Sequence, residues 1–303
     1  MIIIRIMGGL GNQMFQYALY RKLKSMGKEV KLDISWYDDH NTHRSFELDV
    51  FGIEYDVASK KEISKFSNRS SNFLSRIRRK LFGKKNKIYQ EEDFNYDPEI
   101  LEMDDVYLEG YWQSEKYFED IREQLRKEFT FPKEMNKQNK ELLEQMENEN
   151  SVSIHIRRGD YLNKENASIY GGICTDDYYK KAIEYIREKV SNPKFYIFSD
   201  DIEWAKQHFK GDDMTIVDWN NGKDSYYDMY LMSSCKHNII ANSTFSWWGA
   251  WLNQNPEKIV IAPKKWLNNH ETSDIVCDNW IRIDGNGEIR SEEYGVRTGS
   301  TVK

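Results

Sequence analysis

The segment HIRRGDY (155–161) places two guanidinium groups and a carboxylate directly after SVSI, an apolar run that is typical of a buried strand. In open α/β sheets, the loops at the carboxyl ends of the strands line the ligand crevice. An arginine side chain carries a rigid fork of N–H donors that fits phosphate oxygens. The pattern indicates a phosphate-bearing ligand near Arg157 and Arg158, while a surface ion pair at a turn is the alternative that these residues alone leave open.

Two more polar segments follow predicted strands in the same half of the chain. Asp200 and Asp201 come after an apolar run, where their carboxylates can accept hydrogen bonds from a base or a sugar, or cap the next helix. Ser243, Thr244 and Phe245 begin a predicted helix, whose first backbone N–H groups suit a phosphate, with simple helix capping as the alternative. Because all these loops follow parallel strands, we expect them to converge at one sheet edge.

A glycine-rich turn, GGLGNQM (8–14), follows the first predicted strand and matches half of the dinucleotide-binding fingerprint. Asp33 then ends the second strand, where a ribose-binding acid would lie. Met14 stands at the position of the third glycine of the fingerprint. A tight strand-to-helix turn without any ligand contact is the alternative explanation for Gly9 and Gly11. We expect Asn12 and Gln13 to present polar groups to a cleft, and an NAD(P)-dependent oxidoreductase stays open as an alternative.

The hydrophobic pattern predicts a strand–helix–strand unit at the start of the chain and regular strand–helix alternation in the second half. Such alternation predicts parallel sheets and an α/β fold with two Rossmann-like domains that face each other across a cleft. The predicted strands cover 2–6, 29–34, 152–156, 194–199, 214–217, 238–241 and 258–262, and the predicted helices cover 14–26, 176–190, 202–209, 225–233 and 244–252. In the last helix, the spacing of Trp247, Trp248 and Trp251 favours packing over a sugar-binding platform.

The Lys/Glu/Asn-rich segment 133–150 is the expected domain boundary. We therefore expect an N-terminal acceptor-side domain at 1–148, a C-terminal donor-binding domain at 149–285 and a polar tail at 286–303.

Composition excludes several classes of protein. The chain has 303 residues with a formal net charge of -6, which argues against a general affinity for nucleic acid. No apolar run approaches the roughly 18 residues of a membrane span, and the N-terminus lacks the pattern of a signal peptide. We therefore expect a cytoplasmic protein with three reduced cysteines. Without Asp-x-Asp or Cys-x-x-Cys motifs, and with His40 and His43 in a polar loop, we expect no metal site.

The segment 65–87 is basic and amphipathic, since no acidic residue lies between Glu62 and Glu91. Helices of this type lie flat on the surface of anionic membranes. Such binding would place the protein peripherally at the inner membrane. A solvated surface helix or loop is the alternative.

Four motifs in their order and separations resemble the bacterial α-1,2-fucosyltransferases of glycosyltransferase family 11: GGLGNQMFQYA (8–18), HIRRGDY (155–161), FSDD (198–201) and NSTFSWWGAWL (242–252). The resemblance implies the GT-B fold and GDP-β-L-fucose as donor substrate, with no metal or other cofactor. It also implies inversion at the fucose anomeric carbon as the 2-hydroxyl of a terminal galactose attacks. The acceptor would be a galactose-terminated oligosaccharide or lipid-linked glycan in O-antigen or other surface polysaccharide synthesis.

The resemblance also implies roles for the singled-out residues. Arg157 would stabilise the charge that grows on the β-phosphate of the leaving GDP. His155 and one carboxylate of Asp200 and Asp201 would bind the guanosine end. Ser243, Thr244 and Phe245 would hold the diphosphate, and the turn at Gly9, Gly11 and Asn12 would close over the donor.

The general base is less well defined. Asp160 and Glu165 both lie close to the HIRRGDY motif, but Asp160 can instead pair with Arg158, and Glu165 lies in a polar loop where solvation is the alternative. A water-mediated base would make both dispensable. A non-catalytic nucleotide- or glycan-binding protein that uses the same cleft is the third functional alternative.

Overall fold

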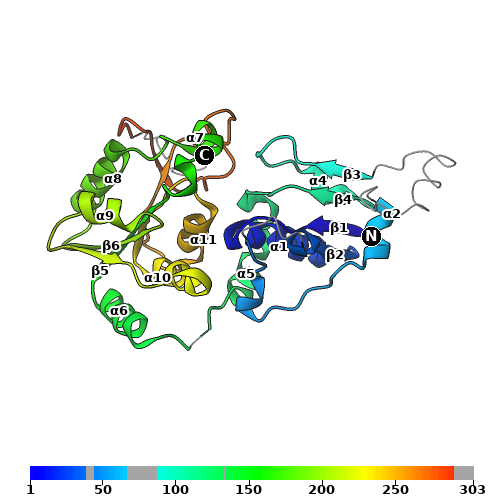
Figure 1. Ribbon diagram of the computed structural model, residues 1–303, viewed down its shortest axis with the longest axis horizontal. Helices are drawn as coiled ribbons and strands as arrows, with labels where there is room; N and C mark the ends of the chain where they lie inside the picture. Colours follow the sequence, from blue (N-terminus) through cyan, green and yellow to red (C-terminus); the bar gives the residue numbers. More distant parts are fainter. Residues whose placement is uncertain (39–43, 67–86, 133, 290–303) are drawn as a thin grey trace, which may run out of the picture.

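The computed structural model describes residues 1–38, 44–66, 87–132 and 134–289, in which two parallel sheets form two α/β units side by side (Figure 1). The first sheet has the order β2 (Val30–Asp33), β1 (Ile2–Arg5), β4 (Tyr107–Glu109), β3 (Ile88–Gln90). The second has the order β10 (Ile281–Ile283), β9 (Val260–Pro263), β8 (His237–Ile239), β5 (Asn150–Ile156), β6 (Pro193–Ser199), β7 (Met214–Val217). The expected two Rossmann-like units of a GT-B fold are confirmed.

Helices cover the sheets, and they include the five helices that the alternation predicts. The first unit contains α1 (Leu10–Ser25), α2 (Lys60–Phe66), α4 (Glu99–Glu102) and α5 (Arg122–Glu128). The second contains α6 (Lys137–Asn148), α7 (Lys164–Tyr170), α8 (Asp176–Lys189), α9 (Ile202–His208), α10 (Tyr226–Ser234) and α11 (Thr244–Leu252). Short 3₁₀ turns lie at Ser35–Asp38, Leu48–Phe51, Glu115–Tyr117, Glu119–Ile121, Asp160–Leu162 and Gly222–Asp224.

Several features differ from the sequence-based expectation, including the bounds or the place of three helices. Helix α1 begins at Leu10, four residues before the predicted start at Met14. Helix α7 occupies the segment that we expected to be a polar loop. Helix α6, which we placed before the domain boundary, packs against α10 and β5 on the side of the second sheet.

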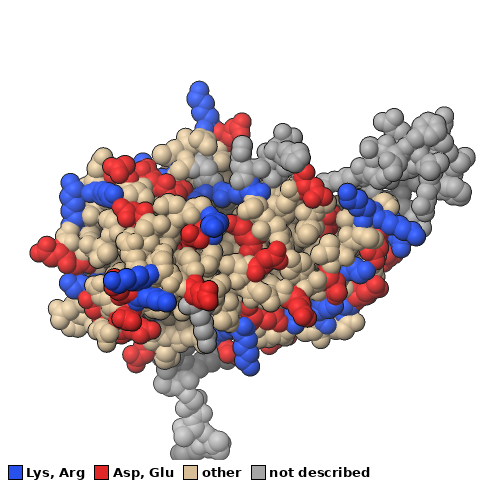
Figure 2. Space-filling view, turned by 60° about the horizontal axis from the view of Figure 1, so that its bottom comes forward, with Lys and Arg blue, Asp and Glu red and all other residues tan. Residues whose placement is uncertain are grey.

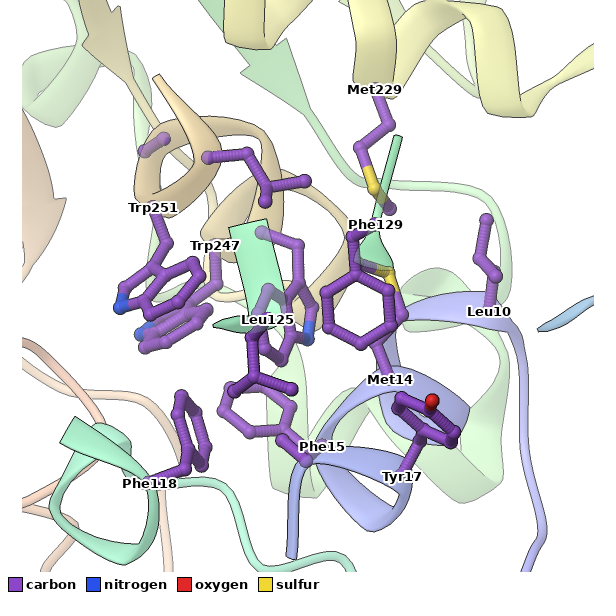
Figure 3. Packing of buried hydrophobic residues seen from close by; sticks show 14 of the residues in the cluster. Leu10, Met14, Phe15, Tyr17, Phe118, Leu125, Phe129, Met229, Trp247 and Trp251 are labelled. Carbon is purple, nitrogen blue, oxygen red and sulfur yellow. The ribbon is translucent and has the colours of Figure 1, made fainter. Parts of the chain in front are cut away.

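A continuous hydrophobic core joins the two units. The fully buried Phe15 of α1 lies 4.5 Å from Trp247 and 4.9 Å from Trp248 of α11, measured between ring centroids (Figure 3). Phe118 stacks on Trp248 at 5.6 Å with an interplanar angle of 15°. The tryptophans of α11 are therefore packing residues, as their spacing predicts.

Some expectations concern residues beyond these ranges. Most of the basic segment 65–87, the pair His40 and His43 and the tail after residue 289 lie outside the described residues. Among the helices that are described, none has the length and apolar character needed to cross a bilayer. Acidic and basic side chains alternate over the face shown in Figure 2, with no extended patch of one sign among its described residues.

Candidate functional site

A cavity of about 460 Å³ lies between the two units, at the carboxyl ends of the strands of the second sheet. This volume falls within the roughly 300–1,000 Å³ of small-molecule sites. The predicted site residues that line it are Gly9, Gly11, Asn12, His155, Arg157, Asp200, Ser243, Thr244 and Phe245. The structure thus brings together residues from the four motifs that carried the resemblance.

The loop after β5 is held by contacts with its neighbours. Arg157 Nη1 forms an ion pair with Asp200 Oδ2 at 3.0 Å, and the backbone N–H of Arg158 donates to Asp200 Oδ1 at 2.8 Å. The Tyr161 hydroxyl donates to the carbonyl of Asn242 at 2.9 Å, and the Arg157 guanidinium lies 5.7 Å from the Tyr161 ring centroid. These contacts fix the Arg157 guanidinium at the cavity wall.

Arg158 and Asp201 lie outside the set of cavity-lining residues. Arg158 Nε pairs with Asp201 Oδ2 at 3.2 Å, and its guanidinium lies 4.2 Å from the Trp204 ring centroid. Asp201 also caps α9 by accepting a hydrogen bond from the backbone N–H of Trp204. Asp201 therefore serves as a helix cap, which was the alternative to ligand binding. The side chain of Asp160, which could instead pair with Arg158, lies outside the described atoms.

His155 lies in the cavity wall, where only 6% of its surface is exposed. Burial, with the nearby Arg157 charge, lowers the pKa of the imidazole to about 3, so the ring is neutral. Its buried Nδ1 has no hydrogen-bond partner within the described chain. Buried polar atoms are almost always satisfied, so this nitrogen is an exception among the described residues.

The start of α11 faces the same cavity. Ser243 precedes the helix in an extended conformation, and its side chain makes no capping bond to any described residue. The first N–H groups of a helix have no intrahelical partner, so this end can bind an anion.

The glycine-rich turn touches α11 directly. A Cβ at Gly11 would lie 2.6 Å from the Thr244 carbonyl carbon, and Trp248 Nε1 donates to the Gly11 carbonyl at 2.9 Å. Gly11 is therefore explained by close helix contact. Asn12 lines the cavity as expected, and its Oδ1 accepts from Gln113 Nε2 at 3.1 Å.

Gln13 and Asp33 do not serve the cavity. Gln13, expected to face the cleft, is fully buried and donates to the carbonyls of Gly8 and Ser45. Asp33 is buried and accepts from the Tyr107 hydroxyl at 2.7 Å, away from the cavity. The acid that supported an oxidoreductase is therefore a structural residue.

Glu165 is exposed on α7 and is not among the residues that line the cavity, although its neighbour Asn166 is. In the described part of the chain, no three His, Cys, Asp or Glu side chains are grouped so as to hold a metal ion.

Sequence reasoning missed Asp228, a carboxylate on α10 that lines the cavity. Asn220 Nδ2 donates to Asp228 Oδ1 at 2.8 Å, and burial raises the pKa of this carboxyl to about 7. A lone acid within the apolar helix YYDMYLMSS was the available signal. Also missed were Arg44, Glu47, Phe94 and Tyr111, which line the wall of the first unit.

Comparison with known proteins gives consistent similarities over the chain. The sequence model described as "Glycosyl transferase family 11" matches residues 1–284. An Escherichia coli alpha-1,2-colitosyltransferase is 38% identical over 93% of this chain and 99% of its own length. The Escherichia coli O-antigen biosynthesis glycosyltransferase WbnK is 38% identical over 91% of this chain and 98% of its own. The human galactoside alpha-(1,2)-fucosyltransferase 1 is 27% identical over 48% of this chain and 42% of its own.

Among solved structures, the NodZ alpha-1,6-fucosyltransferase soaked with GDP-fucose aligns with a TM-score of 0.46 at 17% identity. The alignment covers 83% of this chain and 92% of that chain.

Proposed function

Because the chain belongs to glycosyl transferase family 11, we propose that it transfers L-fucose from GDP-β-L-fucose to the 2-hydroxyl of a terminal galactose. The transfer inverts the anomeric carbon and needs no metal. We place it in the synthesis of O-antigen or another surface polysaccharide, which the name of the Escherichia coli O-antigen biosynthesis glycosyltransferase WbnK supports.

The observation that carries this proposal is that Arg157 and the start of α11 line one cavity. Departure of GDP places negative charge on the β-phosphate in the transition state. A fixed guanidinium and helix N–H groups can stabilise that charge without reorganising, which is a major source of catalysis in such sites. We therefore assign the diphosphate to Ser243, Thr244 and Phe245, with Arg157 on the leaving oxygen.

The nucleobase end of the proposal uses Asp228. Guanine carries adjacent N1–H and N2–H donors, which a single carboxylate can accept together, whereas adenine has no such edge. Asp228 lines the cavity beside Asn220, and its desolvation makes paired N–H donors favourable. The rings of His155 and Phe245, 5.9 Å apart, supply flat surfaces in the same cavity.

The colitosyltransferase relative supports a second candidate donor. Colitose is fucose without its 3-hydroxyl, so GDP-colitose would present the same nucleotide and the same reacting carbon. The two candidates differ only in whether the site accommodates one hydroxyl.

We also propose that residues 65–87 bring the protein to an anionic membrane, where a lipid-linked acceptor would be concentrated. The support is the run of basic and apolar residues without an acid between Glu62 and Glu91.

The test measures GDP release from GDP-fucose and, in parallel, from GDP-colitose by the purified protein in excess EDTA. Acceptors are lactose, N-acetyllactosamine and galactosyl-β-1,3-N-acetylgalactosamine, with the product linkage read by NMR. We expect acceptor-dependent release that yields an α-1,2-linked product. Faster release from GDP-colitose would identify GDP-colitose as the donor instead of GDP-fucose. Binding of GDP without release from either donor would contradict the transfer reaction.

A further inference from the structure

The part of the cavity wall that the first unit forms outside the glycine-rich turn has no role in the donor assignment above. Glu47, Phe94 and Tyr111 lie in this wall, opposite residues that we assign to the nucleotide. Resting on the proposed function, we infer that this wall binds the acceptor galactose, with Phe94 and Tyr111 as its stacking surface and Glu47 as the base that receives the proton of its 2-hydroxyl.

Phe94 and Tyr111 form an aromatic pair with nearly parallel ring planes. Their ring planes differ by 12° and their centroids are 6.5 Å apart, and both side chains line the cavity while half-buried. A galactose ring has one face of C–H groups, which packs on aromatic surfaces while its hydroxyls stay available for hydrogen bonds. Both rings line the cavity, so they offer aromatic surface to such a ring.

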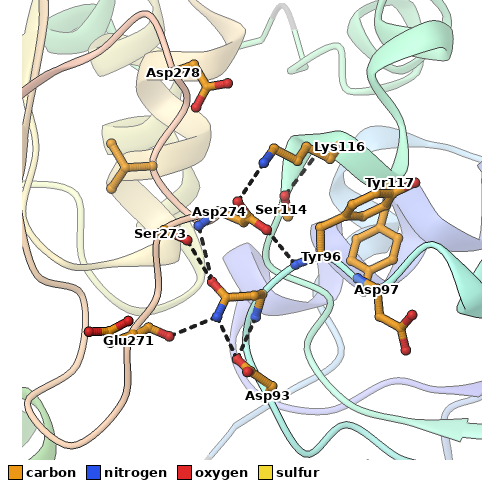
Figure 4. A network of polar contacts seen from close by, with 12 residues as sticks. Asp93, Tyr96, Asp97, Ser114, Lys116, Tyr117, Glu271, Ser273, Asp274 and Asp278 are labelled. Carbon is orange, nitrogen blue, oxygen red and sulfur yellow. Dashed lines mark hydrogen bonds and ion pairs between the residues drawn. The ribbon is translucent and has the colours of Figure 1, made fainter. Parts of the chain in front are cut away.

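The loop that carries Phe94 is held from the opposite unit (Figure 4). Asn95 Nδ2 donates to Asp93 Oδ1 at 2.8 Å and to the carbonyl of Glu271 at 3.0 Å. The backbone N–H of Tyr96 donates to Asp274 Oδ2 at 3.0 Å. These contacts on both sides of Phe94 fix the aromatic surface before a ligand arrives, which lowers the entropic cost of binding.

The far side of the aromatic pair is fixed in the same way. The backbone N–H of Tyr111 donates to Glu91 Oε2 at 2.6 Å, and the rings of Phe94 and His270 form a T-shaped pair with centroids 5.6 Å apart. The aromatic surface is therefore part of the folded frame.

Glu47 is positioned at the start of α1. Its Oε2 accepts the backbone N–H of Leu10 at 3.0 Å, and its own backbone N–H donates to Gln13 Oε1 at 2.8 Å. Burial raises the pKa of the Glu47 carboxyl, against the opposing effects of the Leu10 N–H and the Arg44 charge. Tyr37 is a further titratable group near Glu47. The charges of Glu47, Arg44 and Tyr111 all affect the pKa of its hydroxyl. A partly desolvated carboxylate is a stronger base than an exposed one.

The proposed transfer step forms one bond, breaks one bond and moves one proton. The galactose 2-oxygen forms a bond to the fucose anomeric carbon, and the bond from that carbon to the β-phosphate oxygen breaks. The electron pair leaves with GDP, and the hydroxyl proton passes to the Glu47 carboxylate. Glu165, the base suggested by sequence position, is exposed and outside the cavity lining.

The first test is Glu47→Gln, which keeps an oxygen that can accept the Leu10 N–H. We expect kcat for transfer to fall about a hundredfold or more, with unchanged melting temperature and GDP affinity. With the donor saturating, so that Asp228 is already occupied, kcat/KM for the acceptor should decline in the wild-type enzyme as pH falls and Glu47 becomes protonated. This acid limb should disappear in the variant. Glu54→Gln, an exposed neighbour, is the matched control and should behave as wild type.

The second test is Phe94→Ala. Loss of the stacking surface should raise the acceptor KM roughly tenfold with GDP affinity unchanged, and Phe94→Tyr should restore it. Transfer by Glu47→Gln within about threefold of wild type would overturn the base assignment, and an unchanged acceptor KM in Phe94→Ala would overturn the stacking surface. A wild-type protein that releases no GDP with any galactoside would instead overturn the proposed function itself.

Discussion

At the scale of single side chains, adjacent residues of the same type have different environments. The sequence contains two such pairs, Arg157–Arg158 and Asp200–Asp201, and only one residue of each pair lines the cavity. Asp200 faces the cavity and pairs with Arg157, whereas Asp201 caps α9 and pairs with Arg158. One residue of each adjacent pair is thus available to a ligand, and the other stiffens the loops. Neighbouring residues of one type cannot be told apart by sequence alone, because the direction of each side chain depends on the loop conformation.

Arg157→Ala should distinguish catalysis from binding. Removing a donor that stabilises developing charge costs about 3 kcal/mol, or a factor of roughly 100–1,000 in kcat. The affinity for GDP should fall much less, because the helix start and Asp228 remain. Steady-state transfer rates and calorimetric GDP binding measure the two quantities.

A suitable control is Arg187→Ala, which removes another arginine in an ion pair, with Asp213 at 2.7 Å on the surface of the second unit. It should leave both quantities near wild type. Equal losses of transfer rate and GDP affinity in Arg157→Ala would argue for a binding protein without a catalytic arginine.

At the scale of elements, the junction between the starts of α1 and α11 shapes the cavity. Gly11→Ala would place a methyl group 2.6 Å from a backbone carbon of Thr244, which no side-chain rotation can relieve. We expect a loss of about 1–3 kcal/mol in the free energy of unfolding together with weaker GDP binding, since the anion-binding helix start must move. Urea denaturation and calorimetry check the two effects.

Gly9→Ala provides the comparison, because the nearest described atoms to its methyl group belong to the Arg44 guanidinium, with Nη1 at an ordinary 3.6 Å. That variant should retain the stability of the wild type. If Gly11→Ala proved equally harmless, the tight contact between the two helices would not be required for the site.

Sequence reasoning identified elements with long buried runs or strong helical periodicity, such as β5, β6, α8 and α11. It missed β3, β4 and β10, which have only three residues each and gain their order from neighbouring strands. The start of α1 was also missed, because Gly11 and Asn12 are poor helix formers. Glu47, 37 positions away, supplies the acceptor for the Leu10 N–H.

The same dependence on long-range contacts explains which residues of the candidate site could be predicted from the sequence. Motif residues such as Arg157 and Thr244 could be predicted because strand and helix ends in parallel sheets have fixed places. Glu47, Phe94 and Asp228 could not, since they reach the cavity only through long-range packing. A lone polar residue in an apolar helix, as at Asp228, is the one local signal among them.

At the scale of the whole molecule, the length of the chain suggests two domains with separate cores, yet the largest core is shared. It joins residues of α1 and the first sheet to α10, α11 and the segment after β9. Phe15, on α1, is fully buried against two tryptophans of α11. Two halves that bury each other's apolar surface lose stability together, so their folding should be coupled.

This coupling predicts a single unfolding transition for both units. Phe15→Ala should cost about 3–5 kcal/mol and should lower the protection of β5 as well as of β1 by similar amounts. Hydrogen exchange followed by mass spectrometry, on peptides that cover Ile2–Arg5 and Asn150–Ile156, measures the two units separately. If β5 stayed protected while β1 opened, the units would be independent, and the cavity between them would depend on docking of preformed domains. A coupled loss would mean that the shared core joins the donor and acceptor walls into one cooperative folding unit.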